Sequence, residues 1–240
     1  MNHRKRLDDL QNGRMLWQDP EGFCFGIDAV LLAHYASLRP GDSILDMGCG
    51  NGIIPVLLSV DAPEGIHITG LELQEGPAVL AEENVAWNRL EAMITIVRGD
   101  LKEASALFGR DRFDVVTCNP PYRRTGSGRL SYGEKAAARH ELYCTLEDVI
   151  REASRVLKSR GRLYLVHLPE RLAEICALAD RYHLAVKRLK MVCSREGEAP
   201  SLILLEAVKG GRPGLAAEPS LIIYDRDGAY TPEARHFYGE

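Results

Sequence analysis

The segment Asn119-Pro120-Pro121-Tyr122 carries functional groups suited to methyl transfer onto a planar amine. The lone pair of such an amine is delocalised, so a catalyst must localise it by accepting hydrogen bonds from both N–H groups. The side-chain carbonyl of Asn119 and the backbone carbonyl of Pro120 are two suitable acceptors. Tyr122 offers an aromatic face on which a base can stack, an interaction of about 1–3 kcal/mol. Asn119, Pro120, Pro121 and Tyr122 are therefore the candidate catalytic residues.

The same four residues also suit a rigid turn that ends a strand, because Asn-Pro punctuates loops and two prolines cannot continue a central strand. The sequence upstream favours the chemical interpretation. A short apolar run (43–47) precedes Gly48-Cys49-Gly50-Asn51-Gly52, and a helix-like apolar run (53–60) follows it. Glycines at alternate positions let the backbone approach a ligand closely. A dinucleotide fingerprint would be G-x-G-x-x-G, whereas this spacing is G-x-G-x-G, so a dehydrogenase is disfavoured.

Acidic or amide side chains follow the ends of successive predicted strands. The run 66–71 is followed by Glu72, and the run 93–97 is followed by Gly99 and Asp100. Glu72 lies about twenty residues past the glycines, where such folds place an acid against ribose hydroxyls. One acid alone is more often a helix cap or a solvated carboxylate. The ordered series favours a ligand site at the carboxyl edge of a sheet, formed by Asp46, Glu72, Asp100 and Asn119.

Strands and helices alternate along the chain, which predicts an α/β fold with a doubly wound, mostly parallel sheet. Seven strands are expected, over residues 43–47, 66–71, 93–97, 113–118, 161–167, 184–192 and 201–208. Helices are expected over residues 53–60, 75–88, 145–157 and 169–182. The last two strands are adjacent in sequence, which predicts an antiparallel edge strand. Residues 1–240 are expected to form a single domain with an N-terminal extension and helix (1–40), a core (41–209) and a tail (210–240).

The composition is that of an ordinary globular enzyme. The 240 residues are 45% hydrophobic, with a net charge of −4, and are enough for one hydrophobic core. No apolar run approaches the ~18 residues of a membrane span, and the N-terminus lacks an apolar signal core, so we expect a cytoplasmic protein. The six cysteines form no C-x-x-C pair and predict reduced, buried thiols. The sequence has no cluster with zinc spacing, so no metal is expected.

The loop that follows Tyr122 is basic. Up to residue 140 it has a single acid, Glu134, against five cationic residues, Arg123, Arg124, Arg129, Lys135 and Arg139. Cationic side chains beside the candidate catalytic segment favour a nucleic-acid backbone, so these five residues and His140 are candidate nucleic-acid contacts. A solvated surface is the alternative. The net charge of −4 argues against indiscriminate nucleic-acid binding.

Three motifs together resemble one known family. They are Phe25-Gly26-Ile27-Asp28-Ala29-Val30-Leu31-Leu32, Ile44-Leu45-Asp46-Met47-Gly48-Cys49-Gly50-Asn51-Gly52, and Asn119-Pro120-Pro121-Tyr122 followed by Ala138-Arg139-His140-Glu141. The glycine motif resembles motif I of class I (Rossmann-like) S-adenosylmethionine-dependent methyltransferases. The combination resembles the bacterial tRNA1(Val) adenine-N6 methyltransferases, over most of the chain.

The resemblance implies S-adenosyl-L-methionine as the cofactor and the adenosine 3′ of a tRNA anticodon as the substrate, so the partner is an anticodon stem-loop. It places Asp46 near the methionine end of the cofactor and Asp100 at its adenine amine. Asp28, on the helix before the first strand, is a further candidate contact to the methionine end, and a surface or helix-capping role is the alternative for it. The other expected cofactor contacts are Gly48, Cys49, Gly50, Gly52, Glu72 and Asn119.

Three other functions stay open on the residues alone. A release-factor glutamine methyltransferase uses the same four-residue motif, but the roughly forty residues before the first strand are too few for its helical substrate domain. A guanine methyltransferase acting on ribosomal RNA shares the chemistry, although that group tends to have another aromatic residue in place of tyrosine. A cofactor-binding RNA chaperone without turnover is a non-enzyme alternative that the intact glycine loop and Asn119 do not favour.

Overall fold

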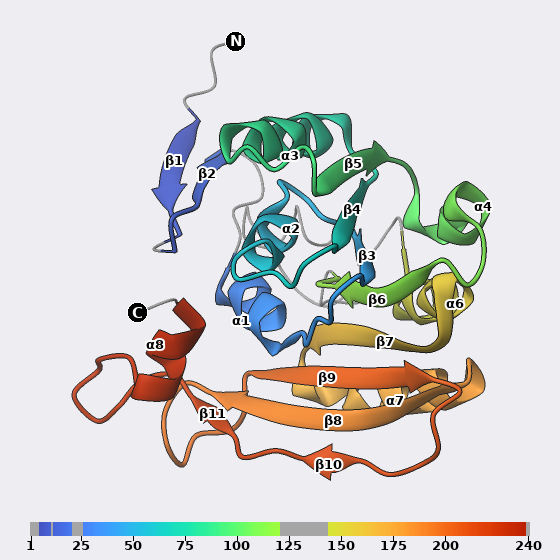
Figure 1. Ribbon diagram of the computed structural model, residues 1–240. Coiled ribbons are helices and arrows are strands. Elements are labelled where there is room, and N and C mark those ends of the chain that lie inside the picture. The colour runs from blue at the N-terminus through green and yellow to red at the C-terminus, as the bar shows by residue number, and fades with distance from the viewer. Residues whose placement is uncertain (1–4, 11, 21–25, 121–143, 239–240) are drawn as a thin grey trace, which may run out of the picture.

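The computed structural model describes residues 5–10, 12–20, 26–120 and 144–238. Its centre is a nine-stranded sheet in the order β10-β8-β9-β7-β6-β3-β4-β5, with β11 also paired to β8 (Figure 1). The strands are β3 (Ser43–Met47), β4 (His67–Glu72), β5 (Ile94–Arg98), β6 (Phe113–Cys118), β7 (Leu157–His167), β8 (Leu184–Cys193), β9 (Leu202–Lys209), β10 (Ala216–Ala217) and β11 (Leu221–Ile222).

The strand directions are those expected of a doubly wound fold. Strands β7, β6, β3, β4 and β5 run parallel to one another, and β9 runs antiparallel to both β7 and β8. These directions confirm the predicted mostly parallel sheet, with the antiparallel strand toward the end of the sheet that β8 and β9 form. Strands β3 to β9 are the seven that the sequence predicts, and the bounds of β3 and β6 agree with the expected 43–47 and 113–118.

Helices connect these strands and cover both faces of the sheet. They are α1 (Ile27–Tyr35), α2 (Ile53–Leu58), α3 (Glu75–Trp87), α4 (Ala104–Phe108), α6 (Leu146–Val156), α7 (Leu172–Arg181) and α8 (Pro232–Tyr238), with short 3-10 turns at η1 (Leu101–Glu103) and η2 (Pro169–Arg171). Helix α6 begins at the expected place because Thr145 and Asp148 form a capping box, in which each side chain bonds the other residue's backbone N–H.

Successive strand residues point to opposite faces and build two hydrophobic clusters. Ile44 and Val115 belong to the cluster that contains the buried residues of α1 and α2. Their neighbours Leu45 and Val116 belong to the cluster that contains those of α6 and α7. This alternation is why short, continuously apolar strands are buried on both sides in a parallel sheet. The carboxyl ends of the strands are then left to carry polar residues.

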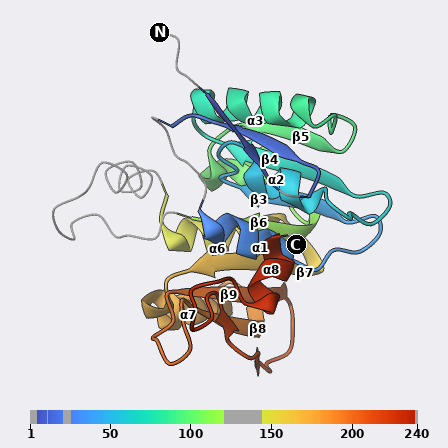
Figure 2. The same ribbon diagram turned by 90° about the vertical axis from the view of Figure 1, so that its left-hand side faces the viewer.

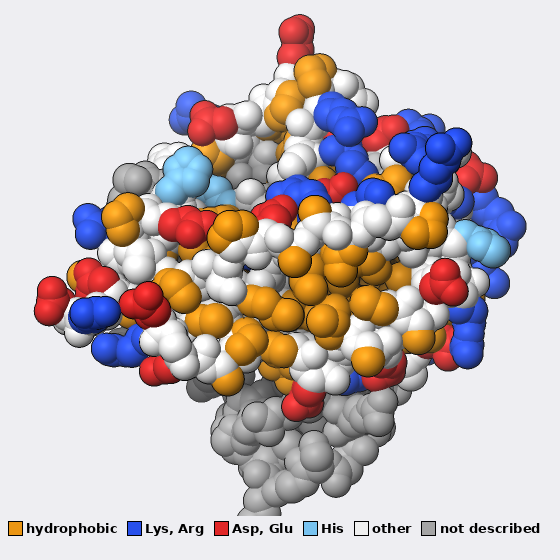
Figure 3. Space-filling model, turned by 90° about the horizontal axis from the view of Figure 1, so that it is seen from below, with side chains coloured by type: hydrophobic (Ala, Val, Ile, Leu, Met, Phe, Trp, Pro, Cys, Tyr) orange, Lys and Arg blue, Asp and Glu red, His pale blue; other side chains and the backbone are white. Residues whose placement is uncertain are grey.

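Both ends of the chain add elements to this core. Strands β1 (Arg6–Asp9) and β2 (Met15–Gln18) pair antiparallel as a separate two-stranded sheet beside α3. In the tail, β10 and β11 pair in parallel with β8, and α8 packs beside α1 (Figure 2). The β10 edge is apolar, since Ala216 and Ala217 are exposed and Leu215 is 50% exposed. Figure 3 views the molecule from this side and shows hydrophobic side chains gathered there.

The described cysteines are free thiols, as expected. Cys49, Cys118, Cys144 and Cys193 are buried and Cys176 is partly buried, while Cys24 lies outside the described residues. No helix in the described ranges is long and apolar enough to span a bilayer.

Candidate active site

Three segments singled out by the sequence meet at one edge of the sheet. Strand β3 lies between β4 and β6, and its Asp46 pairs with Gly70 and with Thr117. The glycine loop begins two residues after Asp46, Glu72 comes two residues after Gly70, and Asn119 comes two residues after Thr117. Because the three strands are parallel, the loop, Glu72 and Asn119 lie at their common carboxyl edge, where open α/β sheets bind ligands.

The glycine loop is folded tightly and leaves space beside its backbone. The N–H groups of Gly48 and Cys49 donate to the carbonyl of Leu71 over 2.8 and 3.0 Å. Gly48, Gly50 and Gly52 have φ angles of 79°, 55° and 85°, in the region that favours glycine. A Cβ built on Gly48 or Gly50 would meet no heavy atom within 4 Å. A ligand therefore has room to approach the loop at these two positions.

Cys49 offers this site its backbone and not its thiol. The residue is only 3% exposed, and a Cβ on Gly70 would lie 2.8 Å from its Sγ. Burial raises the pKa of the Cys49 thiol, and the carboxyl groups of Asp46 and Glu72 raise it further. The thiol is therefore a packing group that remains protonated.

Glu72 ties the end of β4 to the glycine loop. Its Oε2 accepts a hydrogen bond from the N–H of Gly50 over 3.0 Å, and its Oε1 accepts one from the N–H of Gln74 over 2.8 Å. The residue is 5% exposed. Since each carboxylate oxygen has two lone pairs, Glu72 retains the capacity to accept hydrogens from a ligand hydroxyl group beside Gly50.

Asp46 is a fully buried acid beneath the loop. It is 0% exposed, its Oδ1 accepts a hydrogen bond from Thr117 Oγ1 over 2.7 Å, and its Oδ2 has no partner within the described structure. Burial raises the pKa of Asp46 to about 7, the hydrogen bond from Thr117 opposes that rise, and the charge of Glu72 adds to it. Asp46 therefore changes protonation near neutral pH.

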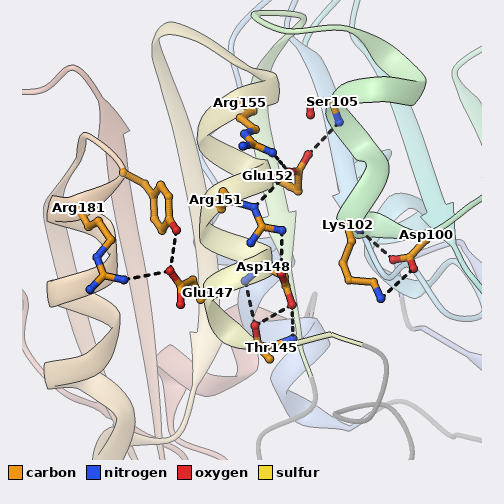
Figure 4. A network of polar contacts seen from close by, with 11 residues as sticks. Asp100, Lys102, Ser105, Thr145, Glu147, Asp148, Arg151, Glu152, Arg155 and Arg181 are labelled. Atoms are coloured by element: carbon orange, nitrogen blue, oxygen red, sulfur yellow. Dashed lines mark hydrogen bonds and ion pairs between the residues drawn. The ribbon is translucent and has the colours of Figure 1, made fainter.

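Asp100 lies on the segment that follows β5, next to the end of β4. The N–H of Gly99 donates to the backbone carbonyl of Glu72 over 2.9 Å, so the two strand ends are in contact. The Asp100 side chain caps η1 by accepting from the N–H of Lys102 over 2.9 Å, and it forms an ion pair of 3.3 Å with the Lys102 ammonium group (Figure 4). Asp100 therefore lies at the carboxyl edge of the sheet, as expected, and its carboxylate already contacts Lys102.

A buried acid on α6 fixes the helix that follows Asp100. Glu152 accepts a hydrogen bond from the N–H of Ser105 over 3.1 Å and pairs with Arg155 over 2.6 Å, as Figure 4 shows. Its side chain is fully buried, so the start of α4 is anchored to α6. The residues between β5 and α4, Asp100 among them, are held from both sides.

Asp28 lies in the first turn of α1. Its Oδ1 accepts a hydrogen bond from the N–H of Ala29 over 3.0 Å, and a Cβ on Gly26 would lie 2.8 Å from the same oxygen. The carboxylate therefore bends back over the start of its own helix. Its expected approach to a cofactor remains a prediction.

The candidate catalytic segment is described only at its start. Asn119 is half-buried and Pro120 is buried. Just before them, the Cys118 thiol donates to the carbonyl of Met47 over 3.1 Å, which fixes the end of β6 beside the end of β3. Eight further predicted site residues lie outside the described residues, namely Pro121, Tyr122, Arg123, Arg124, Arg129, Lys135, Arg139 and His140.

Two asparagines lie at this site that the sequence does not predict as site residues. Asn51, inside the glycine loop, is 6% exposed, and its Nδ2 has no partner within the described structure. Asn84, on α3, donates a hydrogen bond to the carbonyl of Asn51 over 2.9 Å. The position of Asn51 between two glycines was an available signal. Nothing in the sequence near Asn84 indicates a contact 33 residues away.

The comparisons with known proteins agree with this architecture. The model of the methyltransferase small domain family matches residues 27–174. A tRNA1(Val) (adenine(37)-N6)-methyltransferase of Porphyromonas gingivalis is 33% identical over 220 residues, which cover 87% of this chain and 84% of that protein.

Two solved structures are similar in fold. A predicted O-methyltransferase from Agrobacterium tumefaciens has a TM-score of 0.70 and 24% identity, and the match covers 88% of this chain and 95% of that one. A SAM-dependent O-methyltransferase from Thermotoga maritima has a TM-score of 0.56 and 19% identity, with 80% and 68% of the two chains covered. At these identities the likeness establishes the fold alone.

The strand order, the glycine loop and the acid at the end of β4 define a class I S-adenosylmethionine-dependent methyltransferase. In sequence, the resemblance to one branch of that class extends over most of the chain. The chain belongs to the methyltransferase small domain family and, within it, to the tRNA1(Val) (adenine(37)-N6)-methyltransferases.

The residues at the carboxyl edge fit S-adenosylmethionine. The cofactor has ribose hydroxyl groups, which a carboxylate such as Glu72 can bind. The open space at Gly48 and Gly50 permits the cofactor to lie close to the backbone of the glycine loop. The buried atoms Asp46 Oδ2 and Asn51 Nδ2 have no partner in the described part of the chain and supply further polar groups.

In the described ranges, no group of three or more His, Cys, Asp or Glu residues could hold a metal ion.

Proposed function

We propose that this enzyme methylates N6 of an adenosine in tRNA, at the position next to the anticodon of a valine tRNA. The observation that carries the proposal is that Asn119 leaves β6 at the sheet edge occupied by the glycine loop and Glu72. A planar amine held at Asn119 is then beside a cofactor held at the loop. The tRNA substrate is supported by the name of the Porphyromonas gingivalis relative.

We assign the cofactor contacts as follows. Glu72 accepts hydrogens from the ribose hydroxyls, and the backbone of Gly48, Cys49, Gly50 and Gly52 lies against the cofactor. Asp46 and Asp28 contact the methionine end of the cofactor. Asp100 accepts a hydrogen bond from the adenine amine of the cofactor, and Asn119 lies beside its methyl-bearing sulfur. Hydrogen bonding of Asp100 to an adenine amine requires a lone pair that its Lys102 contacts leave available.

Asn119 and Pro120 carry the chemistry on the amine. When bound, the cofactor would supply an electrophilic methyl group from its positively charged sulfur, and breaking of the sulfur–methyl bond would leave that sulfur as a neutral thioether. The Asn119 side-chain carbonyl and the Pro120 backbone carbonyl accept the two N–H hydrogens and localise the nitrogen lone pair as it becomes pyramidal. Such preorganised groups are worth about 10²–10³ in rate each. No general base is assigned, because the amine proton becomes acidic once the methyl group is attached.

The tRNA is held through its backbone and its exposed base. We assign Arg123, Arg124, Arg129, Lys135, Arg139 and His140 to phosphate contacts, and Tyr122, beside Pro121, to stacking on the adenine. An anticodon loop is already single-stranded, so turning the base out costs less than the few kcal/mol needed in a duplex. A tRNA substrate also implies a cytoplasmic enzyme. We further propose that residues 1–240 act as one domain, since the hairpin and the tail both pack on the core.

The test is transfer of labelled methyl groups from S-adenosylmethionine to bacterial tRNA that lacks this modification, followed by nucleoside analysis. We expect labelled N6-methyladenosine with the unaltered protein. The rate of methyl transfer by the variant Asn119→Ala should be about 10²–10³-fold lower. The affinity of this variant for S-adenosylmethionine is also measured, because unchanged affinity shows that the chemical step and not cofactor binding was lost. Label in a release factor or ribosomal RNA, and none in tRNA, would overturn the proposed substrate. Near-normal turnover by Asn119→Ala would overturn the proposed mechanism.

A further inference from the structure

The N-terminal hairpin is held on α3 by two asparagine side chains. Asn84 Oδ1 accepts from the N–H of Trp17 over 2.7 Å, and Asn84 Nδ2 donates to the carbonyl of Trp17 over 3.0 Å. Asn88 makes the same pair of bonds to Met15, over 3.0 and 2.7 Å. Each carboxamide therefore satisfies both backbone groups of one residue of β2.

The spacing explains why two asparagines can replace a neighbouring strand. Residues four apart lie on one face of a helix, about 6 Å apart along its axis. Residues two apart in a strand present their backbone groups to the same edge, about 6.6–6.8 Å apart. The spacing of Asn84 and Asn88 on the helix therefore matches the spacing of Trp17 and Met15 along the strand. Trp17 also packs edge-on against Trp87, with ring centroids 5.4 Å apart.

Asn84 makes one contact that Asn88 does not. The second hydrogen of Asn84 Nδ2 goes to the backbone carbonyl of Asn51 over 2.9 Å, inside the glycine loop. The corresponding hydrogen of Asn88 goes to the carbonyl of Asn84 in its own helix, over 2.8 Å. Asn84 is 0% exposed, so water does not compete for these bonds.

We propose that Asn84 is a positioning residue for cofactor binding, which joins the N-terminal hairpin to the glycine loop by holding Trp17 and Asn51 at once. The flanking residues Gly50 and Gly52 have positive φ angles and great conformational freedom. Holding the carbonyl between them keeps the loop in its binding conformation before the ligand arrives. Preorganisation of this kind strengthens binding because less ordering remains to be done on association.

The same contact orients the Asn51 side chain. Its Nδ2 is buried and has no partner in the described ranges, and an unpaired buried donor is costly unless a ligand satisfies it. Asn84 fixes the backbone from which that donor projects. The inference rests on the cofactor site and is independent of the nucleic-acid substrate.

The test compares Asn84→Ala with Asn88→Ala in the full chain. Both variants lose two bonds to β2, and only Asn84→Ala loses the bond to the glycine loop. The affinity for S-adenosylmethionine is measured by calorimetry without tRNA, at a temperature where urea unfolding shows each variant to be folded. We expect Asn84→Ala to bind about three- to tenfold more weakly than the unaltered protein and Asn88→Ala to bind normally. In turnover, Asn84→Ala should raise KM for the cofactor and leave kcat unchanged.

Equal cofactor affinities for the two folded variants would overturn the proposal, because a purely structural role predicts the same result for both. If Asn84→Ala does not fold, Asn84→Ser provides the test, since its short hydroxyl cannot bridge Trp17 and Asn51, and the same weakening is expected. A protein that binds the cofactor with these affinities and yet methylates no tRNA would overturn the proposed substrate and leave this inference intact.

Discussion

The Thr117 hydroxyl donates a hydrogen bond to the buried carboxyl group of Asp46 over 2.7 Å. Thr117 comes two residues before Asn119, and Asp46 comes two residues before Gly48. The bond therefore joins the strand that carries the proposed amine-binding segment to the strand that carries the cofactor loop. The other oxygen of Asp46 has no hydrogen-bond partner in the described structure. The bond from Thr117 is therefore the main polar contact of the Asp46 side chain.

The variant Thr117→Val tests this contact, because valine keeps the shape of threonine and removes the donor. It leaves both Asp46 oxygens unsatisfied in the interior, which should lower the free energy of unfolding by about 1–3 kcal/mol. The control is Thr117→Ser, which retains the hydroxyl and loses one methyl group, worth about 0.8 kcal/mol. Urea unfolding without cofactor measures both. Equal stability of the valine and serine variants would contradict the assigned bond.

The Asp46 carboxyl also predicts how stability depends on pH. Its folded pKa is raised from 3.8 to about 7, so between these values the folded state binds more protons than the unfolded state. Stability contributed by the neutral carboxyl is then fully present below about pH 4 and is lost as the pH rises toward 7. Asp46→Asn stays uncharged and should escape this loss.

Melting temperatures at pH 5 and pH 8, without cofactor, measure the effect. The difference in favour of Asp46→Asn should grow by several degrees from pH 5 to pH 8, since one pKa unit is about 1.4 kcal/mol and 1 kcal/mol is roughly 2–4 °C in a chain of this size. Glu64→Gln, at an exposed site, controls for the loss of one negative charge. A difference that shrinks with rising pH would refute the raised pKa.

Much of the fold followed from local pattern. Strands β3 and β6 are short apolar runs bounded by polar or glycine residues, and their predicted ends agree with the structure. The ends of parallel strands fall at one edge of a sheet, so the meeting of Asp46, Glu72 and Asn119 also followed from their order in the sequence. The strand ends depend on residues close to one another in the chain, and the meeting of the three side chains depends on the parallel pairing of β3 with β4 and β6.

The elements that were not predicted depend on distant partners. Strand β2 is held by Asn84 and Asn88, which lie 67 and 73 residues away from their backbone partners, and β1 pairs with β2. Strands β10 and β11 have two residues each and exist because β8 offers them an edge. Asp100 was placed at the correct edge, but its engagement with Lys102 follows from side-chain geometry that spacing does not reveal.

At Gly50 of the glycine loop, backbone strain and exclusion of the ligand can be separated by comparison with Gly41. Gly50 and Gly41 both have positive φ angles, of 55° and 78°, and a Cβ on either would meet nothing within 4 Å. Alanine at either position is strained by its backbone conformation, at a cost of about 1–2 kcal/mol. Gly41 precedes β3 and Gly50 follows it, so the two positions lie beyond opposite ends of that strand.

Gly50→Ala and Gly41→Ala should therefore lower the free energy of unfolding by similar amounts, and only Gly50→Ala should lose cofactor affinity, because its methyl group occupies space that the ligand needs. The expected loss is about tenfold or more, or at least ~1.4 kcal/mol. Urea unfolding and calorimetric titration with S-adenosylmethionine give the two quantities. If Gly50→Ala binds the cofactor as tightly as Gly41→Ala does, the open space beside Gly50 is not part of the cofactor site.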